Sequence, residues 1–126
     1  MNIPAKLQYS KDHEWVNLIE EGVALIGLTD FAQDQLGNIV FVNLPEVGDT
    51  IAVGESFGDV ESVKAVSDLY APVTGRVSAI NEELLDAPEG INEAPYDAWL
   101  IEVSDITALD GLLTAAEYDA HCQEEA

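Results

Sequence analysis

The sequence predicts a mostly β fold: a flattened barrel or sandwich of short antiparallel strands, with one short helix and a helical segment near the C-terminus. Short runs with apolar residues at alternate positions recur along the chain, which is the pattern of strands that bury one face. Turn signals rich in Gly, Asp, Asn and Pro separate these runs about every ten residues, a spacing typical of antiparallel barrels and sandwiches.

The N-terminal third contains two predicted strands and the short helix. Residues 13–19 alternate as HEWVNLI, and after a Glu-Gly turn residues 23–28 return as VALIGL. Thr29 is a residue type that caps helices, so we expect a helix over residues 30–36. Gly37 follows where a left-handed helix stop is expected.

One long connection lies before the last of the remaining strands. Residues 82–97 are polar and contain two prolines, and they predict a loop whose length is typical of binding or packing loops. The other strands are expected at residues 38–44, 50–55, 56–63, 66–73, 76–81 and 98–103.

The C-terminal helical segment is predicted over residues 106–123, where leucines recur at helical spacing. TAAE at residues 114–117 matches a capping box, so a break between two helices near Thr114 is expected. The chain contains no linker or long low-complexity segment. We therefore expect one domain over residues 1–126, with its core at about 8–104.

The charge of the chain is strongly one-sided. Twenty-five acidic residues stand against four basic ones, giving a formal net charge of -21. Such a chain repels phosphate backbones and anionic lipids, which disfavours nucleic-acid and membrane partners. Two interpretations remain open: solubility, increased by adaptation to salt, or an acidic surface that steers basic partner proteins.

Targeting signals are not visible in the sequence. No run approaches the roughly 20 apolar residues of a membrane span. The N-terminal segment has no apolar core of a secretory signal and no recognisable transit peptide. The single cysteine, Cys122, cannot form an internal disulfide. We expect a cytoplasmic protein, or a mitochondrial matrix protein if the source is eukaryotic.

Catalytic chemistry by the chain's own side chains is not predicted. The two histidines, His13 and His121, are far apart in sequence, and Cys122 follows the second near the end of the chain. No residues have metal-ligand spacing, and no nucleophile elbow or phosphate loop is present. We expect no catalytic residues and no metal, and we interpret the His121-Cys122 pair as incidental. A hydrolase or a metal protein is therefore the least favoured of the functions considered for this chain.

Lys64 is the one mid-chain lysine among four basic residues. It lies between two apolar-rich runs of similar length, each with a glycine turn at its far end, which predicts a hairpin with Lys64 at its tip. The side chain would then project into water. From spacing alone, an ordinary exposed turn lysine remains the alternative to a modified one. Acylation of the Lys64 ammonium group would need an activated acyl donor and an enzyme that recognises the hairpin tip.

The segment around this lysine, ESVKAVSDLYAPVTGRV at residues 61–77, resembles the lipoyl-attachment signature of the glycine cleavage H proteins. The resemblance runs in order along nearly the whole chain. Its further blocks are HEWV at 13–16, GLTDFAQDQLG at 27–37, VFVNLPEVGD at 40–49, INEAPYDAWL at 91–100 and LLTAAEY at 112–118. Biotin carriers differ because they place their lysine between methionines, and the only methionine here is Met1.

The resemblance implies a lipoyl-domain-like barrel-sandwich hybrid with lipoate joined to Lys64 by an amide bond. It places Glu14 and Asp68 in the cleft that receives the loaded, aminomethyl-bearing arm. It also implies that Glu61, Val63 and Ala65 are recognised during lipoylation, and Asp68 beside the tip is a further candidate for that recognition. A solvent-facing strand residue remains the alternative for Glu14.

The implied function is that of a carrier whose partners do the chemistry. The partners are a pyridoxal-phosphate glycine decarboxylase (P protein), a tetrahydrofolate-dependent aminomethyltransferase (T protein), a dihydrolipoyl dehydrogenase (L protein) and a lipoate-attaching enzyme. The alternative is an H-like protein that relays lipoyl groups to other lipoate-dependent complexes.

Three departures from the family pattern affect the expected cleft and its surroundings. The stretch PYDAW is one residue shorter than usual, Gln35 stands where some relatives have histidine, and Asp12 where some have serine. The details of arm docking are therefore expected to differ, while the attachment is not.

Overall fold

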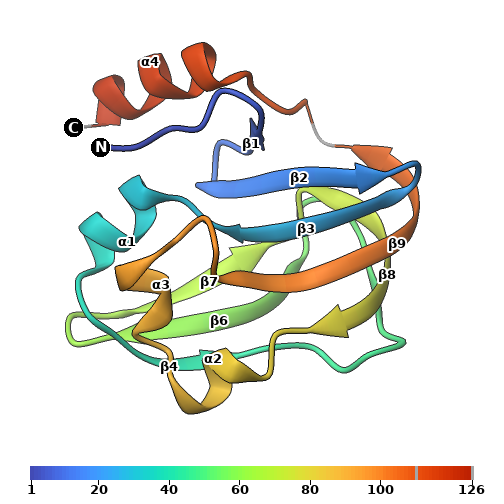
Figure 1. Cartoon of the computed structure of the whole chain (residues 1–126), viewed down its shortest axis with the longest axis horizontal. Coiled ribbons are helices and arrows are strands. Elements are labelled where there is room, and N and C mark those ends of the chain that lie inside the picture. Colours follow the sequence, from blue (N-terminus) through green and yellow to red (C-terminus); the bar gives the residue numbers. More distant parts are fainter. Residues whose placement is uncertain (110, 126) are drawn as a thin grey trace.

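The computed structural model describes residues 1–109 and 111–125 and shows two antiparallel sheets with short helices at one side (Figure 1). The strands are β1 (Gln8–Tyr9), β2 (Glu14–Glu20), β3 (Val23–Leu28), β4 (Ile39–Asn43), β5 (Thr50–Ile51), β6 (Ser56–Ser62), β7 (Val66–Tyr70), β8 (Val73–Ile80) and β9 (Trp99–Leu109). The helices are α1 (Asp30–Leu36), α2 (Glu83–Asp86), α3 (Gly90–Glu93) and α4 (Ala115–Glu125).

The strands form one six-stranded sheet, in the order β1-β2-β3-β9-β8-β5, and one three-stranded sheet, β4-β6-β7. Every paired strand runs antiparallel to its neighbour. The sheets remain separate and do not close into a barrel, so the predicted mostly β architecture is confirmed in its sandwich form. Their facing sides enclose the larger apolar core.

Most predicted elements are present at the expected places. β3 has the predicted bounds, and α1 begins after Thr29, whose side chain accepts a hydrogen bond from the backbone N–H of Ala32. Gly37 follows the helix with a φ of 81°, a conformation that glycine adopts without strain. The prediction overestimated β5, which has two residues, and missed β1.

The predicted helix over residues 106–123 is wrong in its first part. Residues 106–109 continue β9, and the helix begins at Ala115. The pairing of Leu109 with Val73 of β8 and a hydrogen bond from the N–H of Ile106 to the carbonyl of Gly22 hold this segment extended. Tertiary pairing therefore outweighs the leucine spacing. Of the predicted range, Asp110 lies outside the described residues.

The capping box at Thr114 is confirmed. The Glu117 carboxylate accepts from the N–H of Thr114 at 2.9 Å, and the Thr114 hydroxyl accepts from the N–H of Glu117 at 3.2 Å. These two bonds satisfy groups that a helix start otherwise leaves unpaired. They mark the start of α4. The predicted break between two helices is wrong, because β9 and not a helix precedes Thr114 in the described residues.

The predicted loop over residues 82–97 contains two single-turn helices, α2 and α3. Leu84 of α2 and Ile91 of α3 are buried in the larger core. The loop therefore has an apolar side, which the prediction missed because only two buried residues are spread over sixteen polar-rich positions.

A second apolar cluster attaches the C-terminal helix to the N-terminal segment. Its buried members are Leu7, Tyr9, Trp15, Phe31, Tyr118 and Cys122. The rings of Tyr9 and Tyr118 stack with centroids 4.7 Å apart. Helix α4 is thus held against β1 and β2 (Figure 1), and the His121-Cys122 pair lies in this packed helix.

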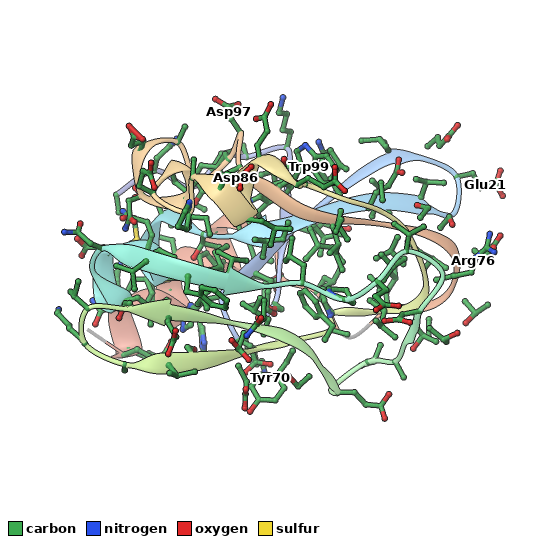
Figure 2. The ribbon with its side chains drawn as sticks, turned by 90° about the horizontal axis from the view of Figure 1, so that it is seen from below. Glu21, Tyr70, Arg76, Asp86, Asp97 and Trp99 are labelled. Carbon is green, nitrogen blue, oxygen red and sulfur yellow. The ribbon has the colours of Figure 1, made fainter. Side chains whose placement is uncertain are left out.

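Acidic side chains lie on the outside of this framework, with Glu14 as a buried exception. Figure 2 shows Glu21 and Asp97 directed away from the core at different edges of the molecule. Arg76, one of the four basic residues, is also exposed and pairs with Asp105 at 3.4 Å. Within the described residues, no helix is long and apolar enough to cross a membrane.

We predict that Gly27→Ala destabilises the fold. Gly27 pairs with Trp15 of the neighbouring strand β2. A Cβ at Gly27 would lie 2.5 Å from two ring atoms of this tryptophan. Overpacking of this kind costs about 1–3 kcal/mol of unfolding free energy, measurable by urea denaturation. Gly111→Ala is the control, because a Cβ there meets nothing within 4 Å. Equal denaturation midpoints for the two variants would contradict the prediction.

Candidate functional site

The candidate attachment site is the tip of the β6–β7 hairpin. The register pairs Glu61 with Val66, so residues 62–65 form the connection, and Lys64 is exposed in it. This confirms the predicted position of Lys64 at a hairpin tip. No ion pair to Lys64 is present among the residues that the structure describes.

Ser62 closes this tip. Its hydroxyl oxygen lies 3.1 Å from the backbone N–H groups of both Lys64 and Ala65, and it accepts from them. The backbone adds a bond from the N–H of Ser62 to the carbonyl of Ala65 at 2.8 Å. A serine side chain that binds nearby backbone groups stabilises a turn. The lysine backbone is therefore fixed while its side chain remains in solvent. Sequence analysis missed this role of Ser62.

The tip is also held against the segment after α1. The N–H of Val63 donates to the carbonyl of Asn38 at 3.0 Å. The stem of Lys64 lies over Gly37, where an added Cβ would be 3.4 Å from the lysine Cε. A Cβ at Gly37 would make an ordinary van der Waals contact with this stem, so the cost of a side chain there would come from the strain of its positive φ.

The predicted recognition residues surround the tip on the outer surface. Val63 and Val66 have exposed fractions of 67% and 60%, and Phe41, which pairs with Glu61 across the sheet, has 48%. Glu61 and Ala65 are also exposed. An enzyme that approaches Lys64 would therefore meet an apolar surface with one carboxylate in it.

A cleft of about 280 Å³ lies between α1, the start of β2 and β7. It brings together Glu14 and Asp68, the two residues that the resemblance assigned to an arm cleft. Asp12 and Gln35, the two positions of departure from the family pattern, also line it. Its apolar wall comes from α1 and the end of β3: Leu28, Phe31, Ala32 and Leu36.

Glu14 is buried, with an exposed fraction of 1%, so the alternative that it is a solvent-facing strand residue is wrong. The Ser10 hydroxyl donates to its carboxylate at 2.6 Å, and the N–H of Tyr70 approaches the other oxygen at 3.4 Å. Burial raises the pKa of Glu14 to about 8, against the lowering effect of the Ser10 hydrogen bond. A cation that enters the cleft would find a carboxyl group with few competing partners.

The distance from the tip to the cleft follows from the strand between them. Asp68 of β7 is four residues after Lys64, and an extended chain spans at most about 3.3–3.6 Å per residue, so the two Cα atoms are no more than about 14 Å apart. An extended lipoyl-lysine arm spans on the order of 10–15 Å. A group attached to Lys64 can therefore reach the cleft without a change in the fold.

The shortened PYDAW stretch lies at the opposite side of α1 from the cleft residues of β7. The indole N–H of Trp15 donates to the carbonyl of Pro95 at 3.0 Å, and the Tyr96 hydroxyl donates to the carbonyl of Asn2 at 2.6 Å. The stretch thus packs against β2 and the N-terminal segment. It does not line the cleft described above.

Two further groups of polar residues were missed by sequence analysis. One is Ser10, whose position before the HEW block gave no sign of its bond to Glu14. The other is the set His13, His121 and Glu125, in which one ligand atom of each lies within 4.8 Å of the others. The first and last of these residues are more than a hundred positions apart, so no spacing rule could have joined them.

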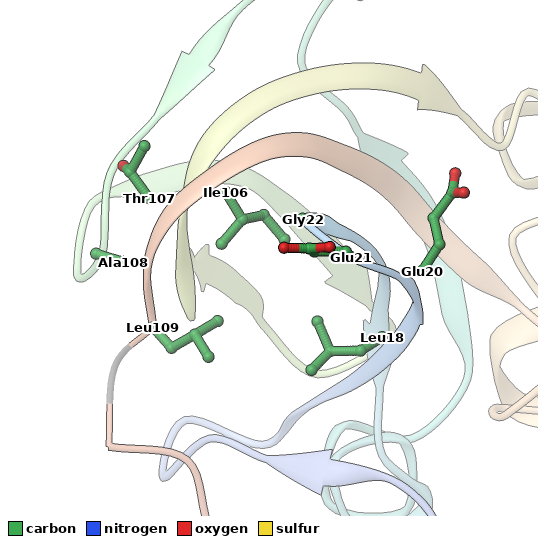
Figure 3. A pocket seen from close by; sticks show the side chains of 8 residues that line it. All are labelled: Leu18, Glu20, Glu21, Gly22, Ile106, Thr107, Ala108 and Leu109. Carbon is green, nitrogen blue, oxygen red and sulfur yellow. The ribbon is translucent and has the colours of Figure 1, made fainter.

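A larger hollow, of about 670 Å³, lies at the other end of the molecule between the β2–β3 hairpin and the end of β9. Figure 3 shows Leu18, Ile106 and Leu109 directed into it, while Glu20 points away. In Figure 1 this end is opposite the β6–β7 tip. We do not assign the site to it, because it is remote from Lys64 and its lining contains no lysine or histidine.

The comparisons with known proteins agree with one another. The family model described as glycine cleavage H-protein matches residues 7–125. The glycine cleavage system H protein of Lachnoclostridium phytofermentans is 57% identical over 125 residues, 99% of this chain and 98% of that protein. The H protein of Anoxybacillus flavithermus is 57% identical over 122 residues, 94% of this chain and 95% of that protein.

The fold comparison gives the same family. The crystal structure of a glycine cleavage system H protein from Mycobacterium marinum superposes with a TM-score of 0.90 at 42% identity, covering 98% of this chain and all of that one. The resemblance and the fold class predicted from sequence are therefore confirmed.

We predict that Ser10→Ala destabilises the protein by about 1–3 kcal/mol, because it leaves the buried Glu14 carboxyl without its hydrogen-bond donor. The measurement is the free energy of unfolding in urea. Ser56→Ala is the matched control, since Ser56 makes only an exposed bond to the carbonyl of Gly58, and its effect should stay within about 0.5 kcal/mol. An equally small effect at Ser10 would show that the bond is dispensable.

Proposed function

Because the chain belongs to the glycine cleavage H-protein family, we propose that it is the lipoyl carrier of a glycine cleavage system, with lipoate attached to Lys64. The single observation that carries this proposal is the exposed lysine at a hairpin tip whose backbone is fixed by Ser62. A carrier needs a rigid anchor and a free side chain, and the tip provides both.

The proposed role is transport, with catalysis left to partner enzymes. With lipoate on Lys64, the disulfide form of the arm would accept the aminomethyl group at the glycine decarboxylase as carbon dioxide is released. The aminomethyltransferase would then pass the one-carbon unit to tetrahydrofolate and release ammonia. The dihydrolipoyl dehydrogenase would reoxidise the remaining dithiol and send its electrons to NAD. Tethering raises the local concentration of the lipoyl group beside each active site without any new contact.

The cleft supports a resting position for the loaded arm. The amine of an aminomethyl group is a cation, and the cleft offers the carboxyl groups of Glu14 and Asp68 together with an apolar wall from α1. An apolar wall shields the group from water, and the carboxyl groups pair with its charge. We propose that the buried carboxyl group of Glu14 is the one that pairs with the amine.

The acidic surface supports brief docking to several partners. A net charge of -21 attracts basic surfaces over distances near the Debye length, and it raises association rates more than affinity. A carrier that visits three enzymes in turn needs fast arrival and ready release. The exposed apolar residues beside the tip give such partners, and the lipoate-attaching enzyme, a local surface to recognise.

The attachment is tested by intact mass spectrometry of the chain after it has been expressed together with a lipoate-attaching enzyme and with lipoate supplied. We expect a gain of about 188 Da, the mass of lipoate less water on forming the amide. Lys64→Arg should abolish the gain, whereas the matched control Lys11→Arg should keep it. A gain that survives Lys64→Arg would move the attachment elsewhere and contradict the proposal.

The same assay, followed over time with a lipoate-attaching enzyme, tests how the tip is recognised. Glu61→Gln should slow lipoylation because it removes the carboxylate beside the tip, and Ser62→Ala should slow it because it loosens the turn. Asp59→Asn, on the same strand, is the control for the loss of one charge. Unchanged rates for both variants would leave Glu61 and Ser62 without a part in recognition.

Glu14 is tested by the release of formaldehyde from the aminomethyl-loaded carrier. Burial favours the neutral form of Glu14, and a cation bound beside it favours the carboxylate. Glu14→Gln keeps the shape and can keep the Ser10 bond, but it cannot ionise to the carboxylate that pairs with the bound amine. We expect release about tenfold faster, corresponding to the roughly 1.5 kcal/mol of a hydrogen bond to a charged group. Glu20→Gln, at the far end of the same strand, is the control. Equal release from wild type and Glu14→Gln would remove Glu14 from the cleft's function.

A further inference from the structure

We propose that His13, His121 and Glu125 form a binding site for Zn²⁺ that joins the C-terminal helix to the segment before β2. This inference goes beyond carrier function and does not depend on the modification of Lys64. It rests on the way in which the fold brings together two imidazoles and one carboxylate from opposite ends of the chain.

The donor atoms already face one another. Nε2 of His13 lies 2.7 Å, and Nε2 of His121 3.2 Å, from the same carboxylate oxygen, Oε2 of Glu125. Zinc bonds to nitrogen and oxygen measure about 2.0–2.2 Å, so tetrahedral ligand atoms stand about 3.3 Å apart. The ligand atoms of the three residues lie within 4.8 Å of one another, so rotations of these exposed or half-buried side chains by up to about 1.5 Å would bring them to this spacing.

The backbone positions of the three residues are fixed by helix α4 and by the turn before β2. His121 and Glu125 are four residues apart on α4, which places them on the same face of the helix. His13 has a φ of 72°, at the turn between β1 and β2. Its ring lies 4.7 Å from that of Phe31 and 5.6 Å from that of His121, centroid to centroid. These contacts orient the imidazole before any ion arrives.

The outer hydrogen bonds suit a metal-bound histidine. Nδ1 of His13 lies 2.7 Å from the hydroxyl of Tyr118, which in turn lies 2.6 Å from the hydroxyl of Thr29. When Nε2 binds a metal, Nδ1 carries the proton and donates to Tyr118, and Tyr118 donates to Thr29. Metal-bound histidines characteristically have such an outer partner, which fixes the ring and its tautomer.

The donor set selects among divalent cations. Two imidazole nitrogens and one carboxylate suit zinc, whereas Mg²⁺ and Ca²⁺ prefer oxygen ligands. Three protein ligands leave a fourth position for water. His13 and Glu125 both line the cleft, so that position would lie beside it. Binding exchanges three present contacts for metal bonds: the two from the histidine Nε2 atoms to Glu125 and a 3.1 Å hydrogen bond between His121 and the carbonyl of Lys11.

The test is calorimetric titration of the full chain with ZnCl2 in a large excess of Mg²⁺, which occupies sites made of carboxylates alone. We expect one Zn²⁺ per chain and a rise in the melting temperature, because an ion that binds only the folded state stabilises it. Co²⁺ in place of Zn²⁺ should give the visible spectrum of a tetrahedral nitrogen and oxygen site without thiolate charge-transfer bands.

The variants separate the proposed ligands from their neighbours. His121→Ala and Glu125→Gln should each weaken Zn²⁺ binding by at least the 10–100-fold that follows loss of an outer-sphere partner. His13→Asn should do the same, and asparagine tolerates the positive φ there. Glu124→Gln removes the same charge as Glu125→Gln from the same helix and should leave the affinity unchanged.

Three results would overturn the proposal. The first is Zn²⁺ affinity in His121→Ala equal to that of the wild type. The second is loss of the site in Cys122→Ser, which would assign it to the buried thiol. The third is release of all bound Zn²⁺ by excess Mg²⁺, which would show nonspecific binding to the acidic surface. Circular dichroism of each variant verifies that it is folded.

Discussion

The function proposed for this protein depends on the register of the β6–β7 hairpin. Pairing Glu61 with Val66 leaves four residues for the turn, and the hydroxyl of Ser62 binds two backbone N–H groups within it. A shift of one residue would direct every side chain of these strands to the other face. Leu69 and Val60 anchor the register, because both are buried in the core between the sheets.

A second constraint holds the cleft beside this hairpin. Two of its carboxyl groups come from different sheets, Glu14 from β2 and Asp68 from β7, so the cleft exists only when the sheets are packed together. The bond between Glu14 and the N–H of Tyr70 crosses between them. Anchor and cleft are thus parts of one rigid framework, and the mobile part of the proposed carrier is the arm alone.

The N- and C-terminal segments complete the cleft from outside. Tyr9, Trp15 and Tyr118 form a cluster separate from the main core, and this cluster positions α4 so that Glu125 reaches the lining of the cleft. A helix with a weak apolar stripe is held here by a few large aromatic contacts, which bury more area than smaller side chains. The same packing joins the two histidines.

Local patterns in the sequence determined most of the framework. Alternation and turn residues gave the strands, Thr29 and Gly37 bounded α1, and the capping box at Thr114 marked the start of α4. The similarity of the two segments around Lys64 indicated the hairpin. These features depend on residues close together in the chain, and neighbouring residues interact in the same way in many folds.

Only the tertiary structure decided the rest. Residues 106–109 form a strand because β8 lies beside them, despite helical leucine spacing. Burial of Glu14, its bond to Ser10 and the meeting of His13 with His121 and Glu125 depend on which faces of β2 and α4 are covered. The meeting of His13 with His121 and Glu125 joins residues distant in sequence. Ser10 and Glu14 are close in sequence, but the importance of their bond depends on burial, which no local pattern contains.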